Sequence, residues 1–311
     1  MRDYIIMADA ACELAEAFSE EYEIKIVPGH LVFPGGKELR TFMNWEEYSR
    51  EEFYADLKKS PSSYATSPAN PQEYAEAFEK YVSQGYDILI ITLSSGISGS
   101  YNNAKTGAKM VLENHPEASI CCIDSLRFGA ACGLMCINAA LLRRKGLSLM
   151  QTAAYIEDNK NRYHQAGWLD DLSFVAKKGR ITHAKAFFGT LVGVKPIGEF
   201  DYNGLTTVIG KAKGANAAYS ALLDYIGETI ENPEEQIIFV AHTNRLPQAE
   251  AYKKMIEERF HPKAVYINDV FPCCGINVGP GLMAAYYVGK PISSDLSVER
   301  EIIGRLLGDQ K

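Results

Sequence analysis

Small hydroxyl and glycine residues follow a predicted strand near the middle of this 311-residue chain. The β-branched run at residues 88–93 is typical of a buried strand, and directly after it comes Ser94-Ser95-Gly96-Ile97-Ser98-Gly99-Ser100. A helical pattern begins at once, so free backbone N–H and hydroxyl groups could converge there on an anionic head group. The alternative is an ordinary strand-to-helix connection in which serines cap the helix. Spacing alone leaves both interpretations open.

Polar residues also follow other predicted strands of the first half. Asp9 comes after the first strand, Thr66 lies before the third predicted helix, and Asp124 ends a later strand. The carboxyl ends of parallel strands lie at one edge of an open sheet, where ligands bind. We therefore expect Thr66, Ser94, Ser95 and Asp124 to meet at one rim, although each alone is typical of a helix cap.

A glycine-rich segment near the end of the chain is the last candidate site. It reads Gly275-Ile276-Asn277-Val278-Gly279-Pro280-Gly281 and precedes an apolar run, residues 282–288, that we expect to be helical. Glycines allow a close approach of the backbone, and Asn277 can both donate and accept hydrogen bonds. A tight turn before a helix explains the same pattern without a ligand.

Known catalytic motifs are not matched. The segment from Gly204 to Ala212 has one residue too many for a phosphate-binding P-loop and ends in alanine, and residues 96–100 lack the last glycine of a nucleophile elbow. The six histidines have no metal-ligand spacing. His242 follows a strand, where we expect it to cap a helix. We predict no catalytic residue, no metal and no cofactor.

Composition narrows the class of protein. The chain has 39 acidic and 32 basic residues, a net charge of −7, which disfavours nucleic acid as a partner. Seven cysteines without a C-x-x-C motif indicate a reduced, cytoplasmic protein. The N-terminus does not resemble a signal peptide, and no apolar run reaches the length of a membrane span.

The predicted elements indicate two domains of the α/β class. In the first half, strands at residues 4–8, 24–27, 88–93 and 119–124 alternate with helices at 12–22, 45–59, 71–84, 130–145 and 149–162. This order predicts a mainly parallel, helix-covered sheet. The second half mixes helices at 169–178, 184–192, 216–229 and 247–260 with strands at 236–241 and 265–268 and a hairpin turning at Asn203-Gly204, which predicts an α+β domain. We place the domains at residues 1–163 and 164–311.

Taken together, these motifs resemble the bacterial DegV family, the fatty-acid-binding subunits that serve a fatty acid kinase. The resemblance covers nearly the whole chain, and seven ordered segments carry it. They are Ala8-Asp9-Ala10-Ala11-Cys12-Glu13-Leu14, Thr66-Ser67-Pro68-Ala69, Ser94 to Tyr101, Asp124-Ser125, Asp170 to Ile181, Lys195-Pro196-Ile197 and Gly275 to Gly281. Three departures stand out: Asn277 replaces the family's histidine, Ala10 and Ala11 replace hydroxyl residues, and the glutamine of T-S-Q-P is absent.

The resemblance implies a non-catalytic protein that buries the acyl chain of a long-chain fatty acid in a tunnel between its two domains. The family's carboxylate contacts correspond to Thr66 and Ser95, with Ser94 beside them and Asn277 at the position of the histidine. Residues that would line the site or dock a partner are Asp9, Ser67, Gly96, Asp124, Arg180 and Gly279. The implied partner is a fatty acid kinase that forms an acyl phosphate, and transient contact with a membrane is compatible with this role.

Two other classes of function stay open at this stage. A small-metabolite or phosphoryl-transfer enzyme could use the same strand-end site, and an interaction module could carry an incidental pocket. Physical chemistry favours a lipid carrier, because each buried methylene contributes about 0.8 kcal/mol and the carboxylate then needs only neutral donors that replace water.

Overall fold

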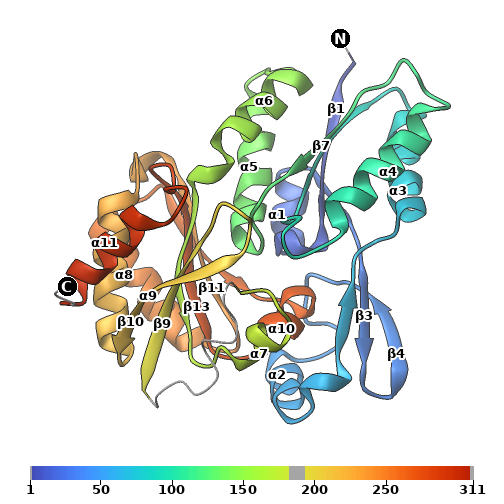
Figure 1. Ribbon diagram of the computed structural model, residues 1–311. Coiled ribbons are helices and arrows are strands. Elements are labelled where there is room, and N and C mark those ends of the chain that lie inside the picture. Colours follow the sequence, from blue (N-terminus) through green and yellow to red (C-terminus); the bar gives the residue numbers. More distant parts are fainter. Residues whose placement is uncertain (1, 182–192, 309–311) are drawn as a thin grey trace. The chain divides into compact units, whose positions relative to one another are not determined.

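The computed structural model of the protein describes residues 2–181 and 193–308 (Figure 1). The chain forms two compact units. The first contains Met1–Glu47, Ser62–Lys160 and Phe271–Cys274, and the second contains Tyr48–Pro61, Asn161–Val270 and Gly275–Lys311. The predicted domain boundary after residue 163 stays a prediction. The helix predicted at residues 184–192 lies outside the described residues.

The first unit is built on a parallel four-stranded sheet, as the sequence predicts. Its order is β2-β1-β6-β7, with strands β1 (Tyr4–Asp9), β2 (Ile24–Val27), β6 (Asp87–Thr92) and β7 (Ile120–Asp124). Helices lie on both sides of this sheet in Figure 1, with α3 (Pro71–Val82) and α4 (Ser100–Leu112) on one side and α5 (Ala130–Arg144) and α6 (Leu149–Asn159) on the other. Both faces are therefore buried, which explains the uninterrupted apolar runs of the strands.

Side chains of alternate strand residues enter the two helical layers. Met7, Ile88 and Ile90 pack with Tyr74 and Phe78 of α3 in one buried cluster. The short helix α1 (Glu16–Glu21) packs on β2. The carboxyl ends of β1, β6 and β7 lie at the same edge of the sheet, because these strands are parallel neighbours. Ser94, Ser95 and Asp124 therefore follow strand ends at one rim, whereas Thr66 belongs to another sheet, and its meeting with them stays a prediction.

A second, antiparallel sheet of the first unit was not predicted. It has the order β4-β3-β5, with β3 (His30–Phe33), β4 (Lys37–Arg40) and β5 (Ala65–Ser67). Gly35 and Gly36 connect β3 to β4, and both have positive φ angles, 80° and 78°. Strand β5 has only three residues, and neither β3 nor β4 shows the apolar–polar–apolar alternation of Ile24-Lys25-Ile26 in β2.

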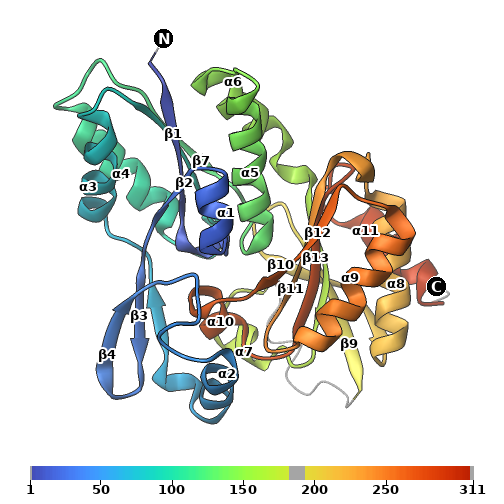
Figure 2. The ribbon, with the colours of Figure 1, turned by 180° about the vertical axis from the view of Figure 1, so that it is seen from behind.

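The second unit contains a six-stranded mixed sheet of order β10-β9-β8-β13-β11-β12. The strands are β8 (Tyr163–Leu169), β9 (Val194–Phe200), β10 (Thr206–Lys213), β11 (Ile237–His242), β12 (Ala264–Asp269) and β13 (Leu282–Val288). Helices α8 (Ala215–Thr229), α9 (Leu246–Phe260) and α11 (Ser297–Leu306) cover it on one side (Figure 2). The predicted hairpin is confirmed, with Gly204 at φ 74° between β9 and β10.

Two predictions for the second half are wrong. Residues 282–288 are not a helix but strand β13, which pairs with both β8 and β11. A fully apolar run of seven residues fits a buried central strand as well as a buried helix, so periodicity could not separate them. Residues 169–178 are not one helix either, because β8 runs to Leu169 and only the short α7 (Ser173–Lys177) is helical.

A polar network crosses the core of this second unit. The buried Glu199 accepts hydrogen bonds from the backbone N–H groups of Gln165 and Phe200 and from the Tyr225 hydroxyl. His164 lies between Glu199 and the carbonyl of Lys290, with 2.8 Å at each ring nitrogen. Each polar group of this network therefore has a partner inside the protein, as a buried network requires.

Within the described ranges of the chain, no helix is both long enough and apolar enough to span a bilayer.

Candidate ligand-binding site

The serine loop, residues 93–99, follows β6 at the carboxyl edge of the parallel sheet. Its backbone N–H groups are already used within the first unit. Leu93 donates to Asp9 at 2.9 Å, Ser94 to the Arg127 carbonyl at 2.8 Å and Ser95 to Asp124 at 3.0 Å. Gly96 donates to the Ser94 hydroxyl, and residues 97 and 98 donate to the Ser94 carbonyl. The expectation that these N–H groups are free to bind a ligand is therefore wrong.

Side-chain hydroxyls are what this loop can offer instead. Ser95 is exposed, and no described residue of the chain forms a hydrogen bond with its hydroxyl. Ser94 is buried and accepts from Gly96, while Ser98 and Ser100 bond to each other at 3.0 Å. The helix-cap alternative is realised in part: Gly99 is the N-cap of α4 and makes no side-chain cap bond, but the Ser98 hydroxyl accepts from the N–H of Ser100, the first residue of α4.

Two carboxylates support the serine loop from neighbouring strand ends. Asp9 is buried and accepts from the N–H groups of Leu93 and Ala11. Burial raises its pKa to about 6, although the Leu93 and Ala11 bonds and Ser100 act in the opposite direction. Asp124 accepts from the N–H groups of Ser95 and Leu126. Asp9 and Asp124, two of the predicted site residues, thus hold the backbone of the serine loop.

Thr66 and Ser67 lie on the small antiparallel sheet. Both belong to β5, where Thr66 pairs with Leu31 and Ser67 with His30. Thr66 is half-buried and Ser67 is exposed. Gly29 passes so close to this strand that a Cβ atom there would lie 2.7 Å from the Ser67 carbonyl oxygen. A residue without a side chain is required at position 29 for β3 and β5 to approach in this way.

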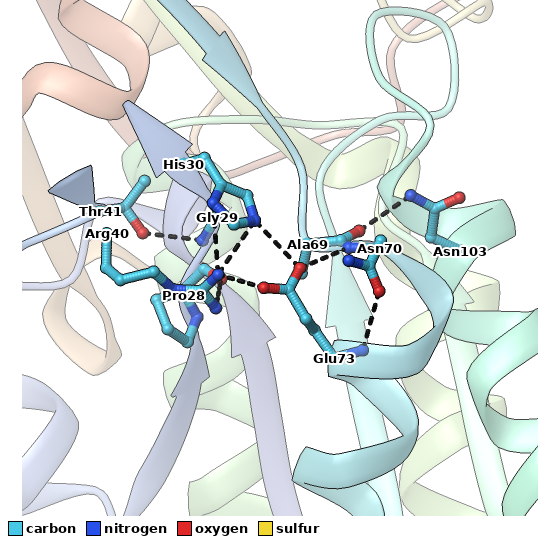
Figure 3. Close-up of polar contacts among 9 residues, drawn as sticks. All are labelled: Pro28, Gly29, His30, Arg40, Thr41, Ala69, Asn70, Glu73 and Asn103. Atoms are coloured by element: carbon cyan, nitrogen blue, oxygen red, sulfur yellow. Dashed lines mark hydrogen bonds and ion pairs between the residues drawn. The ribbon is translucent and has the colours of Figure 1, made fainter. Parts of the chain in front are cut away.

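A polar cluster fixes the chain between β5 and α3 (Figure 3). Asn70 and Glu73 form a reciprocal capping box at the start of α3. The Glu73 carboxylate also pairs with Arg40 of β4 and lies 3.0 Å from His30 Nε2 of β3. Burial raises the pKa of Glu73, but the Asn70 N–H, His30 and Arg40 outweigh it and lower the pKa to about 2. Glu73 therefore joins both strands to the helix that follows Thr66.

One further bond links this segment to the helix after the serine loop. Asn103 of α4 donates from Nδ2 to the Ala69 carbonyl at 2.8 Å, as Figure 3 shows. Thr66 stands three residues before Ala69, and Ser95 stands eight residues before Asn103. The first unit therefore connects the Thr66 segment to the serine loop through α4.

Asn277 belongs to the short helix α10 (Pro272–Val278) and is half-buried. The predicted glycine turn begins later than expected, at Gly279, whose φ is 76° and whose added Cβ would lie 2.4 Å from Phe174. Gly281, with φ 102°, accepts from the Asp170 N–H at 3.2 Å. Gly279 thus has a backbone role, and a side chain at this position would be strained and would collide with Phe174.

The start of α10 depends on a residue that the sequence did not single out. Glu13 is buried, and its carboxylate accepts from the N–H groups of Phe271 at 2.6 Å and Cys274 at 3.1 Å. All three residues belong to the first unit. The only signal was the position of Glu13 in the first family-like motif, because its partners lie more than 250 residues away in the sequence.

Arg180 follows α7 in the second unit. The N–H groups of Gly179 and Arg180 bond to the carbonyls of Ala176 and Val175, which is a Schellman motif with Gly179 at φ 69°. The Arg180 guanidinium donates to the Lys178 carbonyl. This motif explains why a glycine stands at position 179, and it fixes the backbone from which the Arg180 side chain extends.

Asp170 pairs with two cations in the same unit. Lys195 of the K-P-I motif lies 2.5 Å from its Oδ1, and Arg245 contacts its other oxygen. Asp170 and Lys195 stand in two of the family-like segments of the sequence. Arg245 does not, and nothing in the sequence indicates that it lies beside Asp170.

The structure therefore groups the predicted residues in two sets. Asp9, Ser94, Ser95, Gly96 and Asp124 come together around the serine loop of the first unit, and Thr66 and Ser67 are linked to it through α4. Asn277, Gly279 and Arg180 belong to the second unit. That the two sets meet around one head group stays a prediction.

His242 is buried, and its ring lies among groups of the second unit. Nδ1 accepts from the Arg245 N–H at the start of α9, and Nε2 lies 3.3 Å from the Asp269 carboxylate, which also binds Arg50. Burial lowers the pKa of His242, which disfavours its charged form. The capping role expected for His242 is confirmed. Within the part of the chain that the structure describes, no three acidic, histidine or cysteine side chains are placed to hold a metal.

The family assignment follows from the sequence as a whole. A family model described as DegV family matches residues 4–290. The chain belongs to the DegV family. A DegV domain-containing protein of Clostridium perfringens is 30% identical over 291 residues, which cover 93% of this chain and 98% of that protein.

Solved structures of other DegV proteins have the same fold. A DegV family protein from Thermus thermophilus, described by its fatty acid binding, matches with a TM-score of 0.82 at 20% identity, covering 93% of this chain and 100% of that one. A protein from Eubacterium ventriosum, described as binding stearic acid, matches with a TM-score of 0.78 at 24% identity, covering 92% and 98%. The predicted fold class is confirmed.

Proposed function

We propose that this DegV protein binds a long-chain fatty acid and holds the carboxylate with the hydroxyls of Thr66 and Ser95, with Ser94 and Asn277 beside them. Membership of the DegV family supports the proposal, as do relatives described as fatty-acid-binding proteins. The tunnel that the resemblance implies for the acyl chain is part of the proposal. The protein would act as a carrier without catalytic residues.

The strongest structural support for this proposal is the exposed hydroxyl of Ser95. It stands on a loop whose N–H groups from residue 93 to 98 all have acceptors, and its own hydroxyl can donate to a ligand without breaking a bond to a described residue. A hydrogen bond to a charged group contributes about 1.5–3 kcal/mol. Methylenes at about 0.8 kcal/mol each would supply most of the affinity for a long chain. Such a site favours binding over turnover.

We further propose that the bound acid is presented to a fatty acid kinase, which would form an acyl phosphate. Arg180, projecting after the Schellman motif of α7, is the residue that we propose for docking. An Arg180→Ala variant should keep its affinity for the acid and lose its ability to support acyl phosphate formation by the kinase. Loss of both properties would place Arg180 in the binding site instead.

Analysis of the lipid that purifies with the protein tests the carrier function. We expect solvent extraction of denatured protein, followed by mass spectrometry, to release close to one equivalent of a long-chain fatty acid. Delipidated protein should then take up labelled palmitate or oleate. A protein that is free of lipid and also takes up neither acid would contradict the proposal.

A further inference from the structure

Asp9 occupies a buried position directly beneath the serine loop. It is the last residue of β1, and only 5% of its surface is exposed. One carboxylate oxygen accepts from the Leu93 N–H at 2.9 Å and the other accepts from the Ala11 N–H at 3.0 Å. Leu93 is the first residue of the serine loop, so this carboxylate fixes the point at which the loop leaves β6.

The groups that act on Asp9 come from four neighbouring segments. The Ser100 side chain of α4 lowers the pKa of the carboxylate and bonds to Ser98. The titratable groups whose charge would act on it are Tyr74 of α3, Cys12 of the turn after β1, and Cys132 and Cys136 of α5. Burial raises the pKa of both Tyr74 and Cys12, which keeps these two groups neutral at physiological pH. The pKa values of Cys132 and Cys136 are raised as well, so Asp9 is the group of this set whose charge changes near neutral pH.

We propose that Asp9 is a positioning residue for the head-group site, whose ionised carboxylate holds the serine loop in the form that binds the ligand and whose protonation releases Leu93 and weakens binding. This inference rests on the proposed fatty acid function. It adds a second group, which acts on the hydroxyl of Ser95 through the backbone of Leu93.

Hydrogen bonding explains the effect of the proton. An ionised carboxylate accepts at both oxygens, whereas a protonated carboxyl presents an O–H donor at one of them. Leu93 and Ala11 both donate, so one of the two bonds must weaken when Asp9 takes up a proton. Burial raises the pKa of Asp9 to about 6, which places this change between roughly pH 5 and 7.

The pH dependence separates positioning from stability. The pKa of Asp9 in the fold lies above its ordinary value of 3.8, so the folded state binds the proton more tightly than the unfolded state. Stability from this group is thus fully present below about pH 4 and is lost as the pH rises through about 6. Acidification therefore favours the folded state through Asp9, whereas we propose that it weakens binding. A residue with a merely structural role would not give these opposite trends.

Asp87 offers a matched control at the opposite edge of the same sheet. Its carboxylate also accepts from a backbone N–H of a neighbouring strand segment, that of Ser119 at 2.9 Å. The experiment measures the dissociation constant of a monomeric fatty acid between pH 5 and 8 for the wild type, Asp9→Asn and Asp87→Asn. Titration of the ligand itself is common to all three proteins and cancels in the comparison.

We expect the wild type to bind about three- to tenfold more weakly at pH 5 than at pH 7, relative to Asp9→Asn, whose profile should show only the titration of the ligand. Asp87→Asn should follow the wild type. Parallel profiles for the wild type and Asp9→Asn would overturn the proposal. So would wild-type binding that tightens on acidification relative to Asp9→Asn, because repulsion between the two carboxylates would then dominate.

Amide chemical shifts in the ligand-free protein give a readout that does not depend on the fatty acid. The N–H signals of Leu93 and Ala11 should titrate with a midpoint near pH 6 in the wild type and in Asp87→Asn, but not in Asp9→Asn. A wild type that binds no fatty acid while Leu93 titrates would contradict the proposed function and leave the positioning of the loop supported. A Leu93 signal that does not respond to pH would contradict the role of Asp9 itself.

Discussion

Leu93, Ser94 and Ser95 leave β6 in consecutive order, and each of their N–H groups already has an acceptor within the first unit. The sequence identified these residues as a candidate site, because small polar residues after a buried strand are typical of one. It could not predict how their donors are used, since the acceptors Asp9, Asp124 and Arg127 are distant in sequence. Hydroxyls, not backbone amides, are thus the donors available at this loop.

Asn277 stands where the family resemblance places a histidine. An Asn277→His variant should bind a fatty acid about three- to tenfold more tightly at pH 6 than at pH 8, after division by the wild-type ratio over the same range. The reason is that imidazole gains a positive charge in this window, whereas an amide does not. Titrations of a monomeric acid at both pH values supply the two ratios.

Asn277→Gln serves as the control for a changed side chain without a titrating group. It should show the wild-type ratio between pH 6 and 8. If Asn277→His also shows that ratio, residue 277 does not contact the carboxylate, and the head-group role that we propose for it must be abandoned.

At the scale of elements, helices α3 and α4 pack unusually closely at Gly107. An added Cβ would lie 2.7 Å from the Pro71 carbonyl oxygen and 2.9 Å from the Ala75 nitrogen, both backbone atoms. Gly107→Ala should therefore lower the free energy of unfolding by about 1–3 kcal/mol, despite the better helix propensity of alanine. Urea unfolding followed by circular dichroism measures the change.

Gly304 of α11 provides the contrast, because outside its own helix backbone and chain neighbours no atom of the described residues lies within 4 Å of the position where its Cβ would be. Gly304→Ala should raise the free energy of unfolding by up to about 1 kcal/mol through helix propensity alone. Equal effects of the two substitutions would show that the close approach of α3 to α4 is not what requires Gly107.

The Glu73 cluster joins β3 and β4 to α3, and its contribution should depend on pH. The pKa of Glu73 is lowered from 4.5 to about 2, so it stabilises the fold above about pH 4.5, and this stabilisation is lost as the pH falls toward 2. Glu73→Gln should cost about 1–2 kcal/mol at pH 7 and less at pH 3. Unfolding free energies of the wild type and the variant at both pH values give the comparison.

Glu76→Gln is the matched control on the same helix. Glu76 is exposed, and within the described chain its carboxylate accepts a hydrogen bond only from the Gln72 side chain. It should change stability little at either pH. A constant difference between Glu73→Gln and the wild type from pH 7 to 3 would contradict the role of the ionised carboxylate.

Elements with a clear period or strong end signals were predicted well. The parallel strands of the first unit and the helices that begin at Pro71 and Ala130 lie where the sequence indicates. Strand β13 was mistaken for a helix because its residues are apolar on both faces, and the short strands β3, β4 and β5 were missed. Their pairing is set by tertiary contacts, such as the close approach of Gly29 to Ser67, that no local pattern reveals.

At the scale of the whole molecule, the two units are not simple halves of the sequence. Residues 48–61 join the second unit, where Tyr54 donates to the Val270 carbonyl at 2.6 Å and Arg50 pairs with Asp269. Residues 271–274 join the first unit, where Glu13 holds them. Composition and periodicity are local properties and cannot predict such exchanges. The family resemblance instead identified the motifs that bring both units into one functional proposal.

The affinity of the Ser95→Ala variant for palmitate tests the central proposal most directly. No described residue bonds to this hydroxyl, so its removal should leave the loop intact and affect only the ligand. We predict that the delipidated wild type binds palmitate and that Ser95→Ala binds it about tenfold more weakly or worse. Ser83→Ala, which removes an exposed hydroxyl bonded within its own helix, should bind like the wild type. Equal affinities of the wild type and Ser95→Ala, or no binding by the wild type, would contradict the account.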